Sequence, residues 1–269
     1  MIKPIPVVFE SKDVSVHGLF YKASAVEPLS TVVLCHGFPG NNTDVLGLGE
    51  RLMEEGFNAL AFNYRGTWGS EGLLSIANSL EDVISAIRYV KSSSAVREYN
   101  VDNSNITVIG YSFGGGMALL GSLGDSTVRR AVYVAGGNLS EVARLMERNS
   151  EYKRAILKDL NGLPSLGFNS LSGEEMVAEV LADMDKYDLV KHAQALSNKD
   201  ILIIGGWRDQ ENAIEHHILP LYRALQRHGA KQVQIEIFDT DHSFTNVRSQ
   251  LADRIVSWLK ANPFKDTIA

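Results

Sequence analysis

Residues Gly110-Tyr111-Ser112-Phe113-Gly114 form a G-x-S-x-G motif around which the rest of this 269-residue chain can be interpreted. The motif follows the β-branched run Ile106 to Ile109 and precedes the small, apolar run Met117 to Leu120. This order predicts a strand, a sharp turn and a helix, and such a turn raises a serine above the edge of a parallel sheet. We expect a strained backbone at Ser112, with glycines beside it because a Cβ would clash where strand and helix meet. The motif therefore predicts Ser112 as a nucleophile, and the alternative is a glycine-rich helix start with a bystander serine.

Apolar runs alternate with amphipathic patterns on both sides of this motif. The expected strands are residues 7–9, 14–20, 31–35, 58–64, 106–111, 130–135, 201–204 and 233–238. A helix is expected after residue 40, with Asn42 or Thr43 as its N-cap and Gly56 as its stop. Further amphipathic patterns cover residues 80–90, 214–225 and 247–259. This alternation predicts an α/β fold with a mostly parallel central sheet, helices on both faces, and a site at the carboxyl ends of the strands.

The segment from Asn138 to Asn198 departs from this alternation. It contains helical patterns, for example in residues 142–146, 156–160 and 176–184, and no strand-like run. We interpret it as a helical cap or lid inserted into a single domain that spans residues 1–269. Its methionine and leucine side chains are expected to pack the cap, and they could also line an acyl pocket.

A serine nucleophile needs a base, and the base needs a third group that orients it. His242 comes directly after the last expected strand, so it would face the turn that carries Ser112. Asp209, in the loop after residues 201–204, is the best candidate for the acid, and Glu211 is its competitor. Asp241 is disfavoured because side chains of adjacent residues rarely face each other. The resulting order, serine then aspartate then histidine, is the order expected for this turn.

Acyl transfer also requires two N–H donors aimed at the developing oxyanion. We expect the backbone N–H groups of Phe113, which follows the serine, and of Phe38, in the loop after residues 31–35. His36 precedes this loop, and we expect it to hold the loop through side-chain hydrogen bonds and to take no direct part in catalysis.

With these residues in place, the chain resembles an α/β-hydrolase over almost its whole length. The motifs that carry the resemblance are His36-Gly37-Phe38-Pro39-Gly40, Tyr64-Arg65-Gly66-Thr67-Trp68-Gly69-Ser70-Glu71-Gly72, Gly110-Tyr111-Ser112-Phe113-Gly114-Gly115, Asp209 and His242. Within that superfamily the chain is similar to bacterial esterases of the feruloyl-esterase and prolyl-oligopeptidase-like groups. The resemblance implies a carboxylic ester hydrolase with a helical cap.

Two features depart from the family pattern. A single glycine follows His36, where many lipases and esterases have a longer H-G-G-G run, and this suggests small or medium acyl esters. Trp207 and Arg208 form an unusually bulky and charged pair before Asp209.

The predicted triad of Ser112, His242 and Asp209 would also serve an amide or small-peptide hydrolase, a thioesterase or an acyltransferase. A third alternative is a non-catalytic binding module on this scaffold.

Composition and motifs narrow the classes of binding partner and the expected location of the protein. The formal net charge is -6 and no basic patch with interleaved aromatic residues occurs, so we expect a small-molecule ester as partner and no nucleic acid. The one cysteine, Cys35, fits a reducing compartment, and the N-terminus lacks the apolar core of a signal peptide. No apolar stretch could span a bilayer, so we expect a cytoplasmic protein. The sequence has no zinc-binding, dinucleotide or Walker motif, so we expect no metal and no cofactor; whether the chain forms a homo-oligomer stays open.

Overall fold

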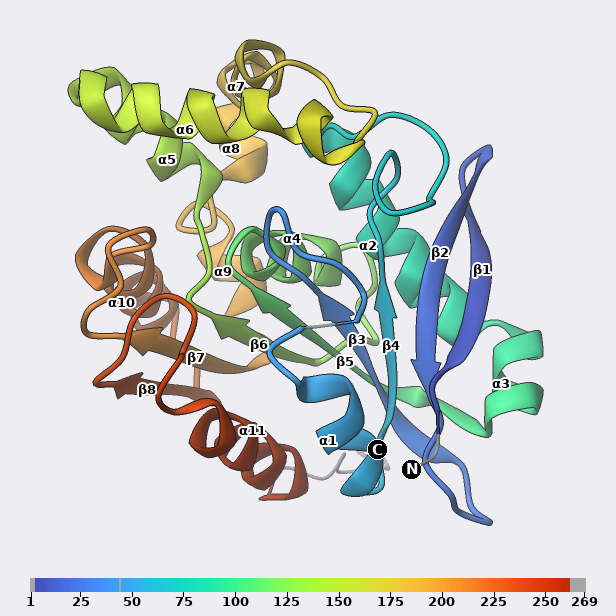
Figure 1. The fold of residues 1–269 in the computed structure, drawn as a ribbon. Helices are drawn as coiled ribbons and strands as arrows, with labels where there is room; N and C mark the ends of the chain where they lie inside the picture. Colours follow the sequence, from blue (N-terminus) through green and yellow to red (C-terminus); the bar gives the residue numbers. More distant parts are fainter. Residues whose placement is uncertain (1–2, 44, 262–269) are drawn as a thin grey trace.

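The computed structural model describes residues 3–43 and 45–261, and its strands form one eight-stranded sheet (Figure 1). The strands are β1 (Ile5–Ser11), β2 (Val14–Tyr21), β3 (Leu29–Cys35), β4 (Asn58–Phe62), β5 (Val101–Tyr111), β6 (Arg130–Val134), β7 (Asp200–Gly206) and β8 (Val233–Phe238). Their order across the sheet is β1-β2-β4-β3-β5-β6-β7-β8. The β1–β2 and β2–β4 pairs are antiparallel, and all the other pairs are parallel. The expected mostly parallel α/β sheet is confirmed.

Helices cover both faces of this sheet, which explains why its central strands are continuous apolar runs. Helices α1 (Leu48–Glu54) and α11 (Arg248–Ala261) pack on one face, and α2 (Ile76–Lys91), α4 (Phe113–Ser122) and α10 (Leu219–Arg227) pack on the other. A short α3 (Ser93–Tyr99) precedes β5, and a π-helical turn (Ile214–Ile218) leads into α10. Every residue of β4 and β6 is buried, as expected for strands enclosed between two helical layers.

The start of α1 was wrongly predicted. The helix begins at Leu48, after Gly47 in the left-handed conformation with φ 72°, and neither Asn42 nor Thr43 caps it. Both residues are held in a preceding loop, because the N–H of Asn42 donates to Asn63 Oδ1 and that of Thr43 donates to Asn41 Oδ1. The expected stop is confirmed, since Gly56 follows the helix with φ 89°.

Between β6 and β7 the chain forms helices and no strand within the described residues. These are α5 (Leu139–Arg148), α6 (Ser150–Gly162), a 3-10 turn (Leu163–Leu166), α7 (Gly173–Ala182), α8 (Met184–Tyr187) and α9 (Ala193–Leu196). In Figure 1, α5, α6 and α7 lie together, apart from the helices that flank the sheet. The Glu179 carboxylate on α7 accepts hydrogen bonds from the Ile76 and Ala77 N–H groups at the start of α2. A backbone bridge between Leu74 and Ser170 lies beside this contact.

The glycine-studded loop from residue 65 to 72 is fixed by a buried ion pair. Arg65 contacts the Asp82 carboxylate on α2 through Nη2 at 2.6 Å and Nε at 2.7 Å, and its backbone N–H donates to the same carboxylate. Ser11, at the end of β1, donates to Asp82 and accepts from Arg65. The Arg65 side chain therefore joins the loop after β4 to β1 and α2.

Candidate active site

Ser112 lies in the sharp turn between β5 and α4, at the carboxyl end of the sheet. Its backbone has φ 56° and ψ -124°, a conformation that confirms the expected strain. The surrounding structure holds this conformation: the Ser112 N–H donates to Val134 O, and its carbonyl accepts from the N–H groups of Gly115 and Gly137. The turn is thus tied both to its own helix and to the end of β6.

The glycines beside Ser112 are required by close backbone contacts. A Cβ on Gly110 would come within 2.0 Å of Gly114 O, and a Cβ on Gly114 would come within 2.2 Å of Cys35 O. Strand β5, helix α4 and the end of β3 therefore meet here with no room for a side chain. The sequence-based explanation of these glycines is confirmed.

His242 and Asp209 come together with Ser112 in one hydrogen-bonded row. His242 Nε2 lies 2.9 Å from Ser112 Oγ, and His242 Nδ1 lies 2.8 Å from Asp209 Oδ2. The Asp209 side chain is fully buried and that of His242 is 8% exposed. The row is consistent with a Ser112 hydroxyl that donates to Nε2 and an Nδ1–H that donates to the carboxylate.

The loop after β7 aims Asp209 at His242. The N–H groups of Trp207 and Arg208 donate to the carbonyls of Phe238 and Thr240, which fixes this loop against the end of β8. Asp209 Oδ1 accepts from the N–H groups of Glu211 and Asn212, leaving Oδ2 for the histidine. The Trp207 side chain points to solvent and is 66% exposed.

The other half of the unusual pair is turned away as well. Arg208 pairs with Asp239 at 3.0 Å, so the arginine does not disturb the Asp209 carboxylate. Asp241 is turned aside too, since it accepts from the backbone N–H and hydroxyl of Thr245.

Glu211 has a position that the sequence did not predict. Its Oε2 lies 3.5 Å from His242 Nε2, the nitrogen that faces Ser112, and its side chain is 72% exposed. Glu211 therefore does not compete with Asp209 for Nδ1; it lies on the opposite side of the imidazole. No sequence signal distinguishes these positions, because they depend on the path of the loop that carries Asp209 and Glu211 past His242.

The two residues predicted to supply N–H donors, Phe38 and Phe113, belong to segments that contact or adjoin Ser112. Phe113 is the first residue of α4, where the N–H has no partner within the helix. A Cβ on Gly37 would lie 2.8 Å from Ser112 Cβ, so the loop that carries Phe38 runs directly past the serine. The rings of Phe38 and Phe113 stack with centroids 3.9 Å apart. Within the described residues, neither amide N–H has an acceptor.

His36 braces this loop, as expected. Its Nδ1 lies 2.7 Å from Gly37 O, and its ring packs edge-on against Tyr64. Burial lowers the pKa of His36 to about 4, so the ring is neutral at pH 7 and its Nδ1–H donates to the Gly37 carbonyl.

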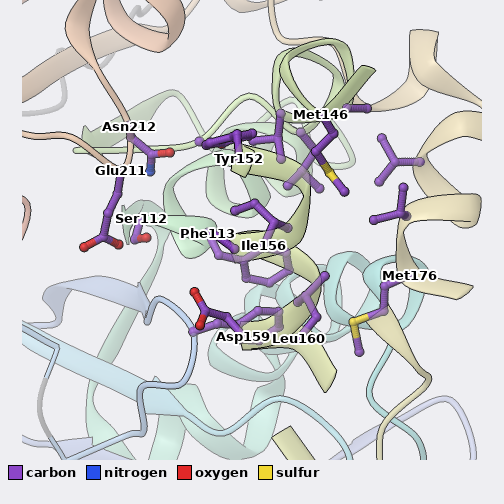
Figure 2. A pocket seen from close by; sticks show the side chains of 18 of the residues that line it. Ser112, Phe113, Met146, Tyr152, Ile156, Asp159, Leu160, Met176, Glu211 and Asn212 are labelled. Atoms are coloured by element: carbon purple, nitrogen blue, oxygen red, sulfur yellow. The ribbon is translucent and has the colours of Figure 1, made fainter. Parts of the chain in front are cut away.

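A cavity of about 370 Å³ opens beside Ser112 (Figure 2). Its wall is mostly apolar and comes from α5, α6 and α7, with Phe38, Phe113 and Ile76 completing it. Met146 and Met176 belong to its buried part. Ser112 is thus placed at the opening of an apolar cavity, where it could attack a carbonyl that carries an apolar substituent.

The side chains of Cys35, His216 and His217 lie outside the row of Ser112, His242 and Asp209. Cys35 is fully buried in β3, and burial raises the pKa of its thiol well above the usual range. His217 is buried and its Nδ1 accepts from the N–H of Asn138, while the neighbouring His216 faces Glu141. In the described part of the chain, no group of three or more His, Cys, Asp or Glu side chains could hold a metal ion. Over the same residues, no helix is both long and apolar enough to cross a membrane.

Sequence comparison matches residues 32–254 to the family described as "Alpha/beta hydrolase family". The quorum-quenching protein AidA of Acinetobacter baumannii is 31% identical over 134 residues, which are 48% of this chain and 42% of AidA. The uncharacterized protein YfhR of Salmonella typhimurium is 26% identical over 243 residues, 88% of this chain and 73% of YfhR. The match to AidA thus spans less than half of that relative's length.

Solved structures of esterases share the fold. A Pyrococcus furiosus esterase superposes with a TM-score of 0.72 at 18% identity, covering 96% of this chain and 91% of its own. Est1E of Butyrivibrio proteoclasticus gives a TM-score of 0.69 at 14% identity, covering 95% and 98% of the two chains. An Exiguobacterium antarcticum esterase gives 0.66 at 20% identity, covering 95% and 100%.

Proposed function

This chain belongs to the alpha/beta hydrolase family, and on that premise we propose that it is a serine hydrolase that cleaves carboxylic esters of small to medium acyl groups. The observation that carries the proposal is the row of Ser112, His242 and Asp209, with hydrogen-bond distances of 2.9 and 2.8 Å. A serine hydroxyl is a weak nucleophile until a positioned base removes its proton, and this row supplies that base.

In the proposed reaction, Ser112 Oγ attacks the ester carbonyl while His242 Nε2 takes its proton. Asp209 holds the imidazole in the required tautomer and stabilises the imidazolium that forms. His242 then gives the proton to the departing alcohol, leaving an acyl group on Ser112. A water molecule, deprotonated by His242, attacks the acyl-enzyme, and the acid and the free serine are released.

We propose the N–H groups of Phe38 and Phe113 as the oxyanion hole. Support comes from their lack of an acceptor in the described chain and from the contact of Gly37 with Ser112. The helix N-terminus at Phe113 also carries a partial positive charge that favours an anion. Preorganised donors of this kind contribute about 10²- to 10³-fold each to the rate of acyl transfer.

We propose that the α5–α9 segment is a cap that forms the acyl pocket. Its helices supply most of the cavity wall, and a cavity of about 370 Å³ lies at the small end of the range for ligand sites. The polar ties at Glu179 and Leu74 join this segment to α2 and to the loop before it. A small cavity of this kind suits a short or medium acyl chain.

A labelling experiment tests the proposal. We expect a fluorophosphonate probe to label the wild-type protein at Ser112 and the purified protein to hydrolyse p-nitrophenyl acetate and butyrate. Ser112→Ala should lose both properties while keeping its circular dichroism spectrum. If this variant is labelled and turns over these esters as well as wild type does, the proposal is wrong.

A panel of esters, amides and thioesters with the same acyl group separates ester cleavage from the related reactions of this fold. We expect kcat/KM to be highest for the esters. Higher kcat/KM values for an amide or a thioester would leave Ser112 as the nucleophile but show that esters are not the preferred substrate class.

A further inference from the structure

The chemistry of the proposed reaction fixes which part of an ester lies near Glu211. His242 must give its proton to the leaving oxygen from Nε2, so the alcohol portion of the ester lies against that nitrogen. Glu211 Oε2 is 3.5 Å from the same nitrogen. The substituent on the alcohol oxygen must therefore pass close to the Glu211 carboxylate.

The acyl portion leaves the carbonyl in another direction, into the apolar cavity. The deep wall of that cavity contains Met146, Met176 and Val180, whose side chains are at most 5% exposed. In Figure 2, Met146 and Met176 lie on the far side of the cavity from Ser112 and Glu211. The cavity therefore has an apolar interior and a polar opening.

The charged side chains among the described residues that line the cavity are acidic. Two carboxylates, Glu211 and Asp159, line the cavity at exposed positions, and Figure 2 shows both on the side where Ser112 lies. No lysine, arginine or histidine is among the described residues that line the cavity; the nearby His242, outside that lining, lies 3.5 Å from Glu211 and offsets its charge only when the imidazole is protonated. Carboxylates of one sign at the opening of an apolar cleft concentrate cations there and repel anions.

Building on the proposed ester hydrolysis, we infer that Glu211 and Asp159 select the alcohol portion of the substrate by charge: the site prefers esters of cationic alcohols, such as quaternary ammonium alcohols, over isosteric neutral ones and rejects esters of anionic alcohols. Glu211 is the principal residue, because it lies beside the proton-donating nitrogen. Asp159 acts at longer range on the same side of the cavity.

Three butyrate esters test this inference: butyrylcholine, its neutral isostere 3,3-dimethylbutyl butyrate, and the anionic 2-sulfoethyl butyrate. We expect wild-type kcat/KM to be highest for the choline ester and lowest for the sulfoethyl ester at low salt. In Glu211→Gln the ratio of choline to dimethylbutyl kcat/KM should fall by about threefold, and the ratio of sulfoethyl to dimethylbutyl should rise by a similar factor. Asp159→Asn should shift both ratios in the same directions by less, and 0.5 M NaCl should reduce the wild-type differences.

A general effect of Glu211→Gln on His242 cancels in these ratios of kcat/KM between esters, because all three esters share the acyl group and the reaction. Glu147→Gln, on an exposed position of α5 that does not line the cavity, is the matched control and should leave both ratios unchanged. Equal ratios in Glu211→Gln and Glu147→Gln would overturn the inference while leaving ester hydrolysis intact. If wild type hydrolyses none of the three esters and Ser112 takes no label, the proposed function and this inference both fall.

Discussion

Gly37 packs directly against the side chain of Ser112. A Cβ at position 37 would lie 2.8 Å from Ser112 Cβ and 3.4 Å from Ser112 Oγ, and the first distance is shorter than real Cβ contacts. The loop from β3 can approach the serine this closely only because residue 37 has no side chain. The same approach places the next N–H, that of Phe38, beside the proposed position of the oxyanion.

Gly37→Ala is therefore expected to damage catalysis with little effect on the fold. The added methyl must displace either the serine or the loop that carries Phe38, so one donor of the proposed oxyanion hole is misplaced. Loss of one such donor lowers kcat by about 10²- to 10³-fold. Steady-state kinetics on p-nitrophenyl butyrate measure this effect.

Gly162→Ala is the matched control for that substitution. Gly162 ends α6 with φ -77°, and a Cβ there would meet no atom within 4 Å. We expect its kcat to match that of wild type. Equal activity of the two variants would show that the Gly37 contact does not position the site.

Asp241 directly precedes His242 in the sequence and Asp209 lies in the loop after β7, yet only Asp209 hydrogen-bonds to His242; Asp241 accepts from Thr245. We expect Asp209→Asn to lower kcat by about 10⁴-fold, because an amide no longer favours the tautomer that leaves Nε2 free to accept a proton. Asp241→Asn keeps an oxygen for the Thr245 N–H and should retain most of the activity. Comparable losses in the two variants would contradict the assignment of Asp209 as the orienting acid.

The sequence was sufficient for the sheet because apolar runs are local patterns. The proximity of Ser112, His242 and Asp209 could be predicted because each residue follows a strand, and the carboxyl ends of parallel strands meet at one edge of the sheet. Gly110 and Gly114 reflect close backbone contacts of β5 with α4 and of α4 with the end of β3. Apolar runs such as Val32 to Leu34 are buried on both faces of the sheet, and such strands can be predicted from their own residues without knowing the neighbouring strands.

Features that depend on contacts between distant segments could not be predicted in this way. The first turn after β3 looked like a helix start because Asn42 and Thr43 are good N-cap residues, but Asn63 on another segment draws Asn42 into a loop. The positions of Glu211 and Glu179 depend equally on which distant N–H groups or nitrogens they meet. Arg65 belongs to a motif that carries the family resemblance, and the sequence does not reveal that its side chain is buried against Asp82.

The Arg65–Asp82 ion pair yields a stability prediction. The Asp82 side chain is fully buried and that of Arg65 is 7% exposed. Asp82→Ala would leave the guanidinium buried without its partner, so the free energy of unfolding should fall by about 3–5 kcal/mol in urea denaturation. The double variant Arg65→Met/Asp82→Leu removes both charges and should lose less than Asp82→Ala does.

The exposed pair Lys12–Glu81 is the control for this experiment. Its atoms are 3.8 Å apart and the lysine side chain is 59% exposed, so Glu81→Gln should change stability by less than about 1 kcal/mol. A loss in the Arg65→Met/Asp82→Leu variant as large as the loss in Asp82→Ala would refute the argument from an unpaired buried charge.

Glu179 joins the α5–α9 segment to the core by capping α2. Its Oε2 accepts from the Ile76 N–H at 2.8 Å, a donor that has no partner within its own helix. Glu179→Ala should cost about 1 kcal/mol of stability and, because Ile76 also lines the cavity, should raise KM for butyrate esters more than it lowers kcat. Glu174→Ala, on the same helix but bonded to Asn161, should leave KM unchanged. If Glu179→Ala has the same KM as wild type, the contact of Glu179 with α2 does not affect the shape of the cavity.

Two buried histidines make the stability depend on pH. Burial lowers the pKa of both His36 and His217 to about 4 in the folded protein, while an unfolded chain protonates a histidine near pH 6.5. Between pH 6.5 and 4 the unfolded state therefore binds more protons, and the free energy of unfolding falls as the pH falls. Each histidine contributes up to about 1.4 kcal/mol per pH unit in this window, and neither contributes to the slope above it.

His217→Asn isolates one of these contributions. The asparagine oxygen can accept the Asn138 N–H in place of Nδ1, so the variant should fold, and it has no ring to protonate. Urea denaturation at pH 7.5, 6.5, 5.5 and 4.5 should give a shallower loss of stability below pH 6.5 than in wild type, by up to about 1.4 kcal/mol per pH unit. Using the difference between the two proteins removes the contributions of the acidic residues that titrate in the same range. His228→Gln, at an exposed position after α10, controls for removal of a histidine elsewhere. Parallel curves for wild type and His217→Asn would show that the buried ring does not drive the acid destabilisation.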